Sequence, residues 1–445
     1  MKLKSQKGKK IGIFGLGLTG RSAFSALDKV AKTILCWDDL EANRNNFISQ
    51  SGSQSLKDIT EKDWQSLDKV IISPGVPQSH SIFLLIKKYN ILISSDIDLF
   101  IEENPQSKII AITGTNGKST TTALIGHILN KAGLDYHVGG NIGLPVLMLP
   151  QGAAGYVLEL SSFQIDLLEN FNPFISILLN ITQDHLDRYG TFEEYSKSKF
   201  RAFQGDGIKI IGIDSDKSRE FYNHLREEGE RKLIPISSSS SNDGIICHSE
   251  QLLDNFFNRD AYALPELQYL KGKHNQENIA AAFAACRALG LAPLEIIESI
   301  SSFNGLKHRF QYLGTKNNIS FYNDSKATNA TSAACSLVSL NNIFWLAGGI
   351  FKEKSLSPID FGLKNVKKAY LFGKDKLLFA NHLENKIEYT ICTTMKEAFE
   401  CAIKDAQMIK ENTNILLAPA CASYDQFKNF EDRGNQFIEL YDSNN

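Results

Sequence analysis

The stretch AITGTNGKST at residues 111–120 decides the fold class of this 445-residue chain. It resembles a phosphate-binding loop, but Ile112 stands where the first glycine of G-x-x-x-x-G-K-[ST] belongs, and Gly114 lies only three residues before Gly117. The apolar run KIIAIT precedes the loop, and TTTALIGHILNKAGL follows it with helical spacing of apolar residues. A glycine-rich turn between a strand and a helix directs backbone N–H groups towards an anion. The segment therefore predicts an α/β domain with a nucleotide-phosphate site at a strand end.

Polar side chains also follow two later strand-like runs of the same region. YVLEL carries Glu159 near its end, and the loop after FISILLN carries His185. Ligands of parallel sheets bind beyond the carboxyl ends of the strands, so we expect both residues near the phosphate loop. There Lys118 would meet the terminal phosphates, and Ser119 or Thr120 would bind a magnesium ion. A single strand-end glutamate is more often a surface residue, but the three strand ends together predict a magnesium–phosphate site.

The rest of the chain continues the α/β pattern. Short apolar runs alternate with amphipathic segments almost throughout, which is typical of domains with mostly parallel sheets. The strand-like runs fall into three blocks, which predict domains at residues 1–103, 104–309 and 310–445.

Composition excludes several classes of protein. The 48 basic and 50 acidic residues nearly balance, which gives no support to a nucleic-acid partner. The seven cysteines are scattered without a C-x-x-C pair, which predicts a reduced, cytoplasmic protein without disulfides or a thiolate metal site. No apolar run reaches the roughly 18 residues that a membrane span needs. The basic and apolar N-terminus contains several glycines and is interpreted as a first strand and turn, not as a signal peptide.

The segment GLGLTG near the N-terminus leaves two interpretations open. Gly15, Gly17 and Gly20 fit the dinucleotide pattern G-x-G-x-x-G after a strand, and Asp38 and Asp39 follow about 20 residues later. This pattern suits a nicotinamide-dependent oxidoreductase. The same geometry can also hold another pyrophosphate, including that of a UDP-sugar.

Two segments of the last block carry lysine and hydroxyl side chains just after strands. NDSKATN contains Asp324, Lys326 and Thr328, and APACASYDQFKNFEDRG contains Ser423. Ammonium and hydroxyl donors can share the two oxygens of a carboxylate, so a pocket for a carboxylate-bearing substrate is one interpretation. Ordinary loop capping is the other.

Taken together, these motifs resemble the Mur ligase family, the ATP-dependent amino-acid ligases of peptidoglycan assembly. The resemblance covers essentially the whole chain and is carried by GLGLTGRS, SPGVP, TGTNGKST, GGNIG, ELSSFQ, NITQDHLDRYG, YSKSK, KGKHNQEN, GLKHR, NDSKATN and PACASYDQFKNFEDRGN. In this family TGTNGK[ST] is the normal phosphate loop. The resemblance implies a Rossmann-like UDP-sugar domain, a central P-loop ATPase-type domain with a mostly parallel sheet, and a Rossmann-like amino-acid domain.

The last two motifs are the most discriminating, and they imply a ligase that joins D-glutamate to UDP-N-acetylmuramoyl-L-alanine through an acyl phosphate. The family positions that match UDP-sugar contacts are Leu18, Thr19, Ser73 and Asn141. Those that match ATP contacts are Gly114, Thr115, Asn116, Gly117, Lys118, Ser119, Thr120, Asn275, Arg309 and Asp324. Two magnesium ions are implied, at Ser119, Glu159, His185 and a carbamylated Lys199, and the catalytic positions are Lys118, His185 and Lys199. The D-glutamate positions are Lys326, Thr328, Lys352, Ser423 and Phe430, with Lys354 competing with Lys352.

Three alternatives stay open at this point. A folylpolyglutamate-type or other Mur-type ligase shares the phosphate loop, an oxidoreductase would use the first glycine motif, and a nucleotide-regulated binding protein would lack catalysis. We expect a monomer that binds only small-molecule substrates.

Overall fold

The computed structural model describes residues 1–60, 62–169, 171–239, 243–267, 269–353 and 355–444. They form two compact units, one of residues 1–263 and 277–300 and the other of residues 264–276 and 301–445. The described residues carry three sheets, and each sheet lies inside one of the three predicted domain ranges. The first two predicted ranges contribute to the same compact unit, and the boundaries at 103 and 310 stay predictions.

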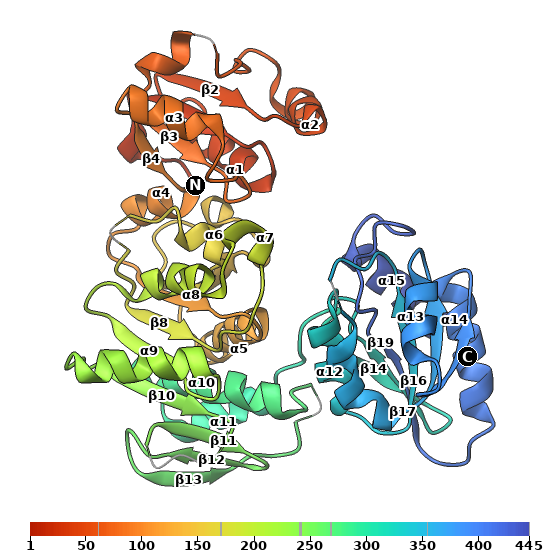
Figure 1. The fold of residues 1–445 in the computed structure, drawn as a ribbon. Helices are drawn as coiled ribbons and strands as arrows, with labels where there is room; N and C mark the ends of the chain where they lie inside the picture. Colours follow the sequence, from red (N-terminus) through yellow and green to blue (C-terminus); the bar gives the residue numbers. More distant parts are fainter. Residues whose placement is uncertain (61, 170, 240–242, 268, 354, 445) are drawn as a thin grey trace. The chain divides into compact units, whose positions relative to one another are not determined.

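The N-terminal sheet is parallel, with strand order β2-β1-β3-β4 (Figure 1). Its strands are β1 (Lys10–Phe14), β2 (Thr33–Trp37), β3 (Lys69–Ile72) and β4 (Leu92–Ser94). The helices between them are α1 (Leu18–Leu27), α2 (Glu41–Ser51) and α3 (Ser81–Lys88). The loops after β1 and β3 therefore leave the sheet at the same edge, which brings GLGLTG and SPGVP together.

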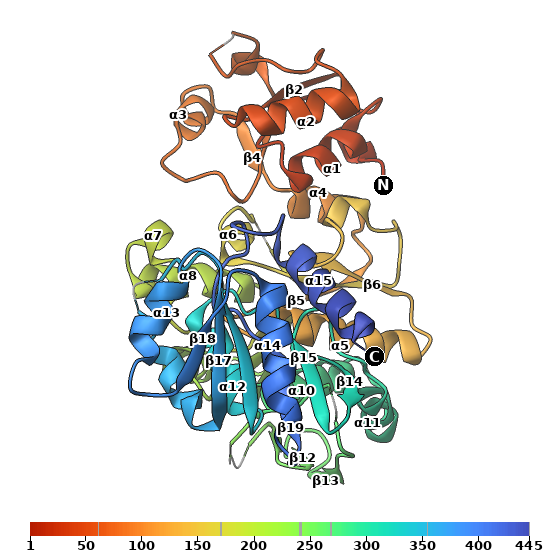
Figure 2. The same cartoon turned by 90° about the vertical axis from the view of Figure 1, so that its right-hand side faces the viewer.

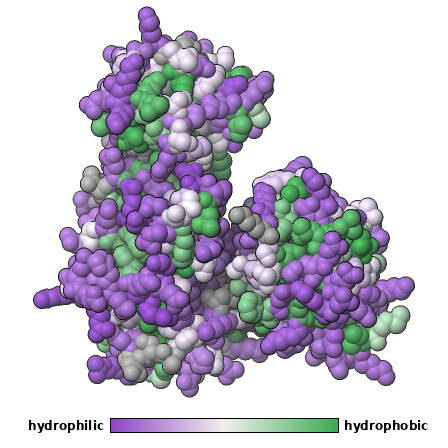
Figure 3. Space-filling model, in the orientation of Figure 1, coloured by the Kyte–Doolittle hydropathy of each residue, from purple (hydrophilic) through white to green (hydrophobic). Residues whose placement is uncertain are grey.

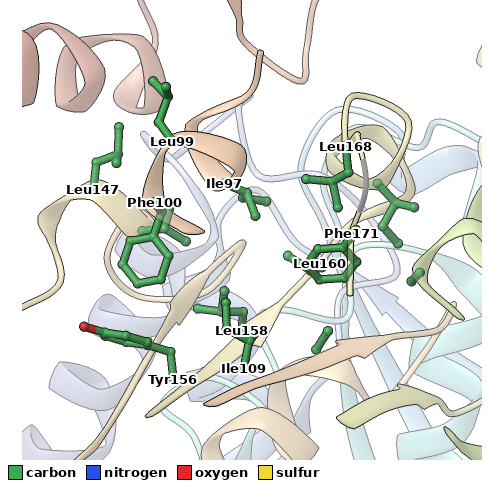
Figure 4. Close-up of a cluster of buried hydrophobic side chains, with 14 of the residues drawn as sticks. Ile97, Leu99, Phe100, Ile109, Leu147, Tyr156, Leu158, Leu160, Leu168 and Phe171 are labelled. Carbon is green, nitrogen blue, oxygen red and sulfur yellow. The ribbon is translucent and has the colours of Figure 1, made fainter. Parts of the chain in front are cut away.

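Helix α4 (Asp96–Glu103) leads from this sheet to the next one. It begins with a capping box in which Ser95 and Asp98 exchange hydrogen bonds. Figure 4 shows Ile97 and Phe100 directed towards the strands below, where the Phe100 and Tyr156 rings meet edge-on with centroids 4.6 Å apart. The helix thus contributes its apolar face to a buried cluster that continues into the central sheet.

The central sheet has nine strands in the order β13-β12-β11-β10-β9-β8-β5-β7-β6. They are β5 (Lys108–Thr113), β6 (Tyr136–Gly140), β7 (Gly155–Glu159), β8 (Ile175–Leu178), β9 (Ile208–Gly212), β10 (Leu233–Ser237), β11 (Ile245–His248), β12 (Gln251–Asp254) and β13 (Asp260–Ala263). Pairing is parallel from β6 to β11, and β12 and β13 are antiparallel. The helices are α5 (Lys118–Lys131), α6 (Ser162–Ile165), α7 (Leu186–Tyr189), α8 (Phe192–Phe200), α9 (Asp216–Glu227), α10 (Lys273–Ala288) and α11 (Pro293–Ser301). The phosphate-loop strand β5 lies between β7 and β8, so the three predicted strand ends are neighbours.

The third sheet has the order β14-β15-β19-β16-β17-β18 and is parallel apart from β14. Its strands are β14 (Gln311–Lys316), β15 (Ile319–Asn323), β16 (Ile343–Gly348), β17 (Val366–Phe372), β18 (Glu388–Ile391) and β19 (Thr413–Leu417). Apolar residues of α12 (Ala330–Val338) and α13 (Lys376–Leu383) pack on one face. Those of α14 (Met395–Gln407) and α15 (Phe430–Ser443) pack on the other, so the sheet is covered on both sides (Figure 2).

The predicted α/β fold is confirmed.

Hydrophilic side chains predominate on the face drawn in Figure 3, with hydrophobic residues in scattered groups. Within the described part of the chain, no helix combines the length and apolar character needed to cross a membrane.

Candidate functional site

The phosphate loop lies between β5 and α5, as the sequence predicts. Gly117 caps the helix with φ of 85° and Gly114 has φ of 148°, conformations that favour glycine. A side chain on Gly114 would also press on the backbone of Asn180. Lys118 folds back over the loop, where its Nζ donates to the carbonyl oxygens of Gly114 and Thr115 at 2.9 Å each. The loop is thus shaped to receive an anion, with a cation held at its mouth.

Glu159 connects the phosphate loop with the neighbouring strand-end loop. The Ser119 hydroxyl donates to Glu159 Oε2 at 2.5 Å, and the Asn141 amide donates to Glu159 Oε1 at 2.8 Å. The Glu159 side chain is buried at 2% exposure. A hydroxyl and a carboxylate facing each other at the start of a phosphate-binding helix are the oxygen donors that Mg²⁺ prefers, so Ser119 and Glu159 fit the predicted first metal site.

His185 and Lys199, predicted for a second metal site, lie against the same aromatic ring. The His185 ring centroid lies 6.2 Å from that of Tyr195, and Lys199 Nζ lies 4.8 Å from the Tyr195 ring. Lys199 Nζ donates to Gly114 O at 3.0 Å, and its side chain is buried. Burial, and then the nearby Lys118 cation, hold the pKa of Lys199 well below its ordinary value. Among the described residues, no group of three or more His, Cys, Asp and Glu side chains is arranged to hold a metal.

A cavity of about 830 Å³ unites the residues predicted to contact the UDP-sugar. Its lining includes Leu18, Thr19, Ser73 and Asn141, and it also includes His185. Asn141 therefore belongs both to this cavity and to the hydrogen-bonded chain that ends at the phosphate loop. The structure brings these four residues together, whereas their contact with a UDP-sugar stays a prediction.

Asp38, which the oxidoreductase interpretation requires as a ribose ligand, is already engaged. Its carboxylate accepts hydrogen bonds from the backbone N–H groups of Leu16 at 2.6 Å and Leu40 at 2.8 Å, and from the Asn43 amide at 2.9 Å. The neighbouring Asp39 carboxylate is 59% exposed and contacts His80 at 2.9 Å. Asp38 stands at the position that normally binds a dinucleotide ribose, but its carboxylate forms hydrogen bonds within its own loop instead.

The remaining predicted ATP residues belong to the second compact unit. Asn275 is buried, and its amide donates to Lys271 O at 2.8 Å. Asp324 accepts from the backbone N–H of Phe310 at 3.1 Å and from the Ser336 hydroxyl. Burial raises the pKa of Asp324, while the charge of the nearby Arg309 acts in the opposite direction. Arg309 and Asp324 are therefore neighbours, and the assignment of all three to ATP stays a prediction.

The predicted amino-acid residues gather at the carboxyl ends of β15, β16 and β19. Lys326 Nζ lies 3.8 Å from the centroid of the Phe430 ring. Lys352 Nζ lies 5.3 Å from the ring of Tyr424, the residue after the buried Ser423. Thr328 follows Lys326 in the same loop and donates its backbone N–H to Lys326 O at 2.7 Å. The competing Lys354 lies outside the described residues.

Arg433 is a site-region residue that the sequence interpretation missed. It is fully buried, and its guanidinium donates to the Ser325 hydroxyl at 2.9 Å, to Ser325 O at 2.8 Å and twice to Cys421 O at 3.1 Å. It thereby joins the two loops that carry Lys326 and Ser423. The only signal in the sequence is an arginine in the first turn of α15, a position that normally faces solvent.

Arg188 and Phe163 were also missed. The Arg188 guanidinium lies 4.0 Å from the Phe163 ring centroid, and the His185 ring lies 4.8 Å from the same centroid. Arg188 also donates to Val76 O at 3.2 Å. The turn that carries His185 is therefore fixed to the loop after β3.

Comparisons with known proteins show the family of the chain and its overall fold. A family model of the Mur ligase middle domain matches residues 112–286. Over 444 residues the chain is 49% identical to the UDP-N-acetylmuramoylalanine–D-glutamate ligase of Rickettsia bellii (strain RML369-C), with 99% of this chain and 98% of the relative covered.

Solved structures give the same fold at low identity. The UDP-N-acetylmuramate–alanine ligase of Thermotoga maritima superposes with a TM-score of 0.60 and 17% identity, covering 98% of this chain and all of that one (100%). The MurF ligase of Thermotoga maritima in complex with ADP gives a TM-score of 0.59 and 16% identity, covering 99% of this chain and 96% of that one.

Proposed function

The chain belongs to the UDP-N-acetylmuramoylalanine–D-glutamate ligase family of the Mur ligases, and we propose that it adds D-glutamate to UDP-N-acetylmuramoyl-L-alanine with ATP in peptidoglycan synthesis. One observation of the structure carries this proposal. The buried Glu159 binds Ser119 of the phosphate loop with one carboxylate oxygen and Asn141 of the 830 Å³ cavity with the other. ATP on the phosphate loop and a UDP-linked substrate on the Asn141 loop would therefore both lie next to the Glu159 carboxylate.

The reaction follows from the low reactivity of a carboxylate towards an amine. Transfer of the γ-phosphoryl group of ATP to the alanyl carboxylate forms an acyl phosphate and releases ADP. The unprotonated D-glutamate amine then attacks the acyl carbon, phosphate leaves with the electrons of the C–O bond, and the nitrogen loses a proton to phosphate or water as the amide forms. Lys118 and the N–H groups of the phosphate loop hold the triphosphate in line with the carboxylate. In this step Lys118 exchanges its bonds to Gly114 O and Thr115 O for bonds to phosphate oxygens.

Ser119 and Glu159 would hold one magnesium ion. When bound, magnesium offsets the charge of the transferring phosphoryl group. His185, on the wall of the UDP-sugar cavity, is proposed for the second ion.

We also propose that Lys199 becomes a carbamate. Its neutral amine would add to carbon dioxide with release of a proton, which turns a buried amine into an anion beside the Tyr195 ring, the ring that His185 also lies near. The burial of the Lys199 amine supports this assignment, since desolvation disfavours its ammonium form and favours the neutral amine that reacts with carbon dioxide.

Lys326, Thr328, Lys352, Ser423 and Phe430 are proposed to bind D-glutamate. The ammonium groups would pair with its two carboxylates, and the Phe430 ring holds the Lys326 side chain in place. We further propose that the protein is a monomer and that it acts in the cytoplasm. The seven free cysteines support the cytoplasmic location.

The proposal is tested by phosphate release from ATP in the presence of UDP-N-acetylmuramoyl-L-alanine. D-glutamate, L-glutamate, L-lysine and meso-diaminopimelate are added in turn. We expect release only with D-glutamate, accompanied by one dipeptide product per phosphate. A faster reaction with another of these amino acids would place the protein on a different branch of the family, and no release with any of them would contradict a ligase.

A further inference from the structure

Glu277, on the first turns of α10, has no role in the reaction described above, yet it is buried behind the phosphate loop. Its residue exposure is 7%. Its Oε2 accepts a hydrogen bond from Asn180 Nδ2 at 2.9 Å, whereas its Oε1 is buried and has no hydrogen-bond partner among the residues that the structure describes. That oxygen faces Gly212, where a Cβ atom would lie only 2.3 Å from it. A buried carboxyl with one unsatisfied oxygen destabilises a fold, so packing alone gives no reason for a glutamate here.

Asn180, the partner of Glu277, holds the peptide of Asn116 at the centre of the phosphate loop. Its Oδ1 accepts from Asn116 N–H at 2.9 Å, and its Nδ2 donates to Asn116 O at 3.3 Å. The Asn180 backbone carbonyl also accepts from Thr115 N–H at 2.8 Å. The orientation of this one amide therefore sets the direction of two successive peptides in the loop.

Glu277 determines which way the Asn180 amide points. If the amide were flipped, its oxygen would face Glu277 Oε2 at a hydrogen-bond distance, and its NH₂ would face the N–H of Asn116. The first contact would then place two acceptors together, and the second would place two donors together. An acceptor at position 277 thus selects the single orientation in which Asn180 supports the loop.

The next residue of α10 supports the loop in a similar way. Asn278 Oδ1 accepts from the Thr121 hydroxyl at 3.1 Å, and it lies 2.3 Å from where a Cβ atom of Gly117 would be. The start of α10 therefore lies against the phosphate loop at Gly117 and against α5 at Thr121 through Asn278, and Glu277 reaches the centre of the loop through Asn180.

We propose that Glu277 is a positioning residue for ATP, which acts through Asn180 to hold the Asn116 peptide in the phosphate-binding conformation. The inference rests on the proposed function in so far as the bound phosphate is that of ATP. Burial raises the pKa of Glu277 to about 8, and in the acid form Oε2 still accepts from Asn180 when the proton is on Oε1. The role therefore requires an acceptor at this place and does not require a charge.

The test compares Glu277→Leu with Glu277→Gln. In Glu277→Leu we expect the KM for ATP and the Kd for ADP to rise about tenfold, with the KM values for the UDP-sugar and D-glutamate unchanged. Its Tm should stay the same or rise, because a half-satisfied carboxyl has been removed. Glu277→Gln keeps an acceptor oxygen and should lie within about twofold of the wild type in all of these quantities.

Asp254→Asn is the matched control, because Asp254 is also a buried acid of the same unit, and its Oδ2 has no hydrogen-bond partner among the described residues and lies 3.9 Å from Arg287 Nε. Whatever change Asp254→Asn makes to the Tm, we expect its KM for ATP to equal that of the wild type. If Glu277→Leu fails to fold, Asn180→Asp replaces it, since a carboxylate cannot donate to Glu277 and should weaken ADP binding likewise.

Three results would overturn the role: ADP binding within twofold of wild type in Glu277→Leu, equal loss for all three substrates, or a Glu277→Gln variant as impaired as Glu277→Leu. ADP binding is measured without any amino acid, so it tests Glu277 even if the proposed ligase reaction is not found.

Discussion

Single residues decide the chemistry in each of the two units. In the first, Lys118 and Lys199 both donate to Gly114 O, so two lysine side chains converge on one carbonyl of the phosphate loop. In the second, Lys326 lies over an aromatic ring at a distance typical of a cation–π contact. Buried or ring-held lysines of this kind are suited to binding anions, because little side-chain entropy is lost when the ligand arrives.

Replacement of Lys199 tests its role directly. Lys199→Ala should lower kcat roughly 100- to 1,000-fold or more, because it removes the anionic metal ligand that the carbamate would supply. A short carboxylate added to the assay should restore part of the rate. Lys197→Ala is the matched control, since the Lys197 side chain is 59% exposed and pairs with Glu194. Wild-type activity in Lys199→Ala would remove the carbamate from the mechanism.

Lys326 is predicted to serve one substrate only. Lys326→Ala should raise the KM for D-glutamate roughly 10- to 100-fold, because a charge-assisted hydrogen bond contributes about 1.5–3 kcal/mol. The KM for ATP should change less than threefold. Steady-state kinetics with each substrate varied in turn make the comparison, and equal rises for both substrates would contradict the pocket assignment.

At the scale of elements, the placement of helices after parallel strands builds the site. Strands β5, β7 and β8 are adjacent, so three loops that are far apart in the sequence supply Ser119, Glu159 and the His185 turn. Helix α4 begins with a different feature. Its first residue, Asp96, is 2% exposed, and within the described part of the chain its Oδ1 has no hydrogen-bond partner.

Asp96 gives the fold a measurable pH dependence. Burial raises its pKa to about 7 from an ordinary value of 3.8, so the folded state retains a proton that the unfolded state loses between these values. The stability that this proton contributes is complete below pH 3.8 and is lost as the pH rises through about 7. Between pH 5 and 8 the loss is roughly 2–3 kcal/mol, at about 1.4 kcal/mol per pH unit.

Asp96→Asn removes this titration. The Tm of the wild type should fall relative to that of the variant between pH 5 and 8, as measured by thermal melting at both pH values. Other carboxyl groups titrate in both proteins and cancel in the comparison. A constant difference in Tm across this range would mean that Asp96 is ionised throughout.

The sequence predicted the elements that have strong periodicity and missed those that depend on distant partners. KIIAIT, YVLEL and FISILLN are continuous apolar runs, and they form the buried strands β5, β7 and β8. Strands β12 and β13 are four residues each and mix polar with apolar side chains, so no local pattern marks them. They exist because β11 offers them an edge to pair with.

The same distinction applies to the site. The phosphate loop and Glu159 were found because loop glycines and strand-end acids are local signals. Arg433 and Glu277 were not found, because their partners Ser325 and Asn180 lie 108 and 97 residues away in the chain. Only the tertiary structure shows that each of these charged residues is buried.

At the scale of the whole molecule, the glycine motif of the first sheet had suggested an oxidoreductase. The structure commits Asp38 to the backbone of its own loop, and family membership assigns the motif to a ligase. We therefore expect no binding of NADH in a fluorescence titration, while UDP-N-acetylmuramoyl-L-alanine binds under the same conditions. NADH binding that competes with the UDP-sugar would show that the cavity accepts dinucleotides.

The carboxylate shared by Ser119 and Asn141 has a thermodynamic consequence. If one bound nucleotide changes the orientation of Glu159, it also changes the loop that binds the other nucleotide. Thermodynamic linkage requires the effect on the two binding affinities to be mutual. If bound ADP raises the affinity for the sugar nucleotide by some factor, the bound sugar nucleotide must raise the affinity for ADP by the same factor. The order in which the two arrive then alters the route to the ternary complex but leaves its free energy unchanged.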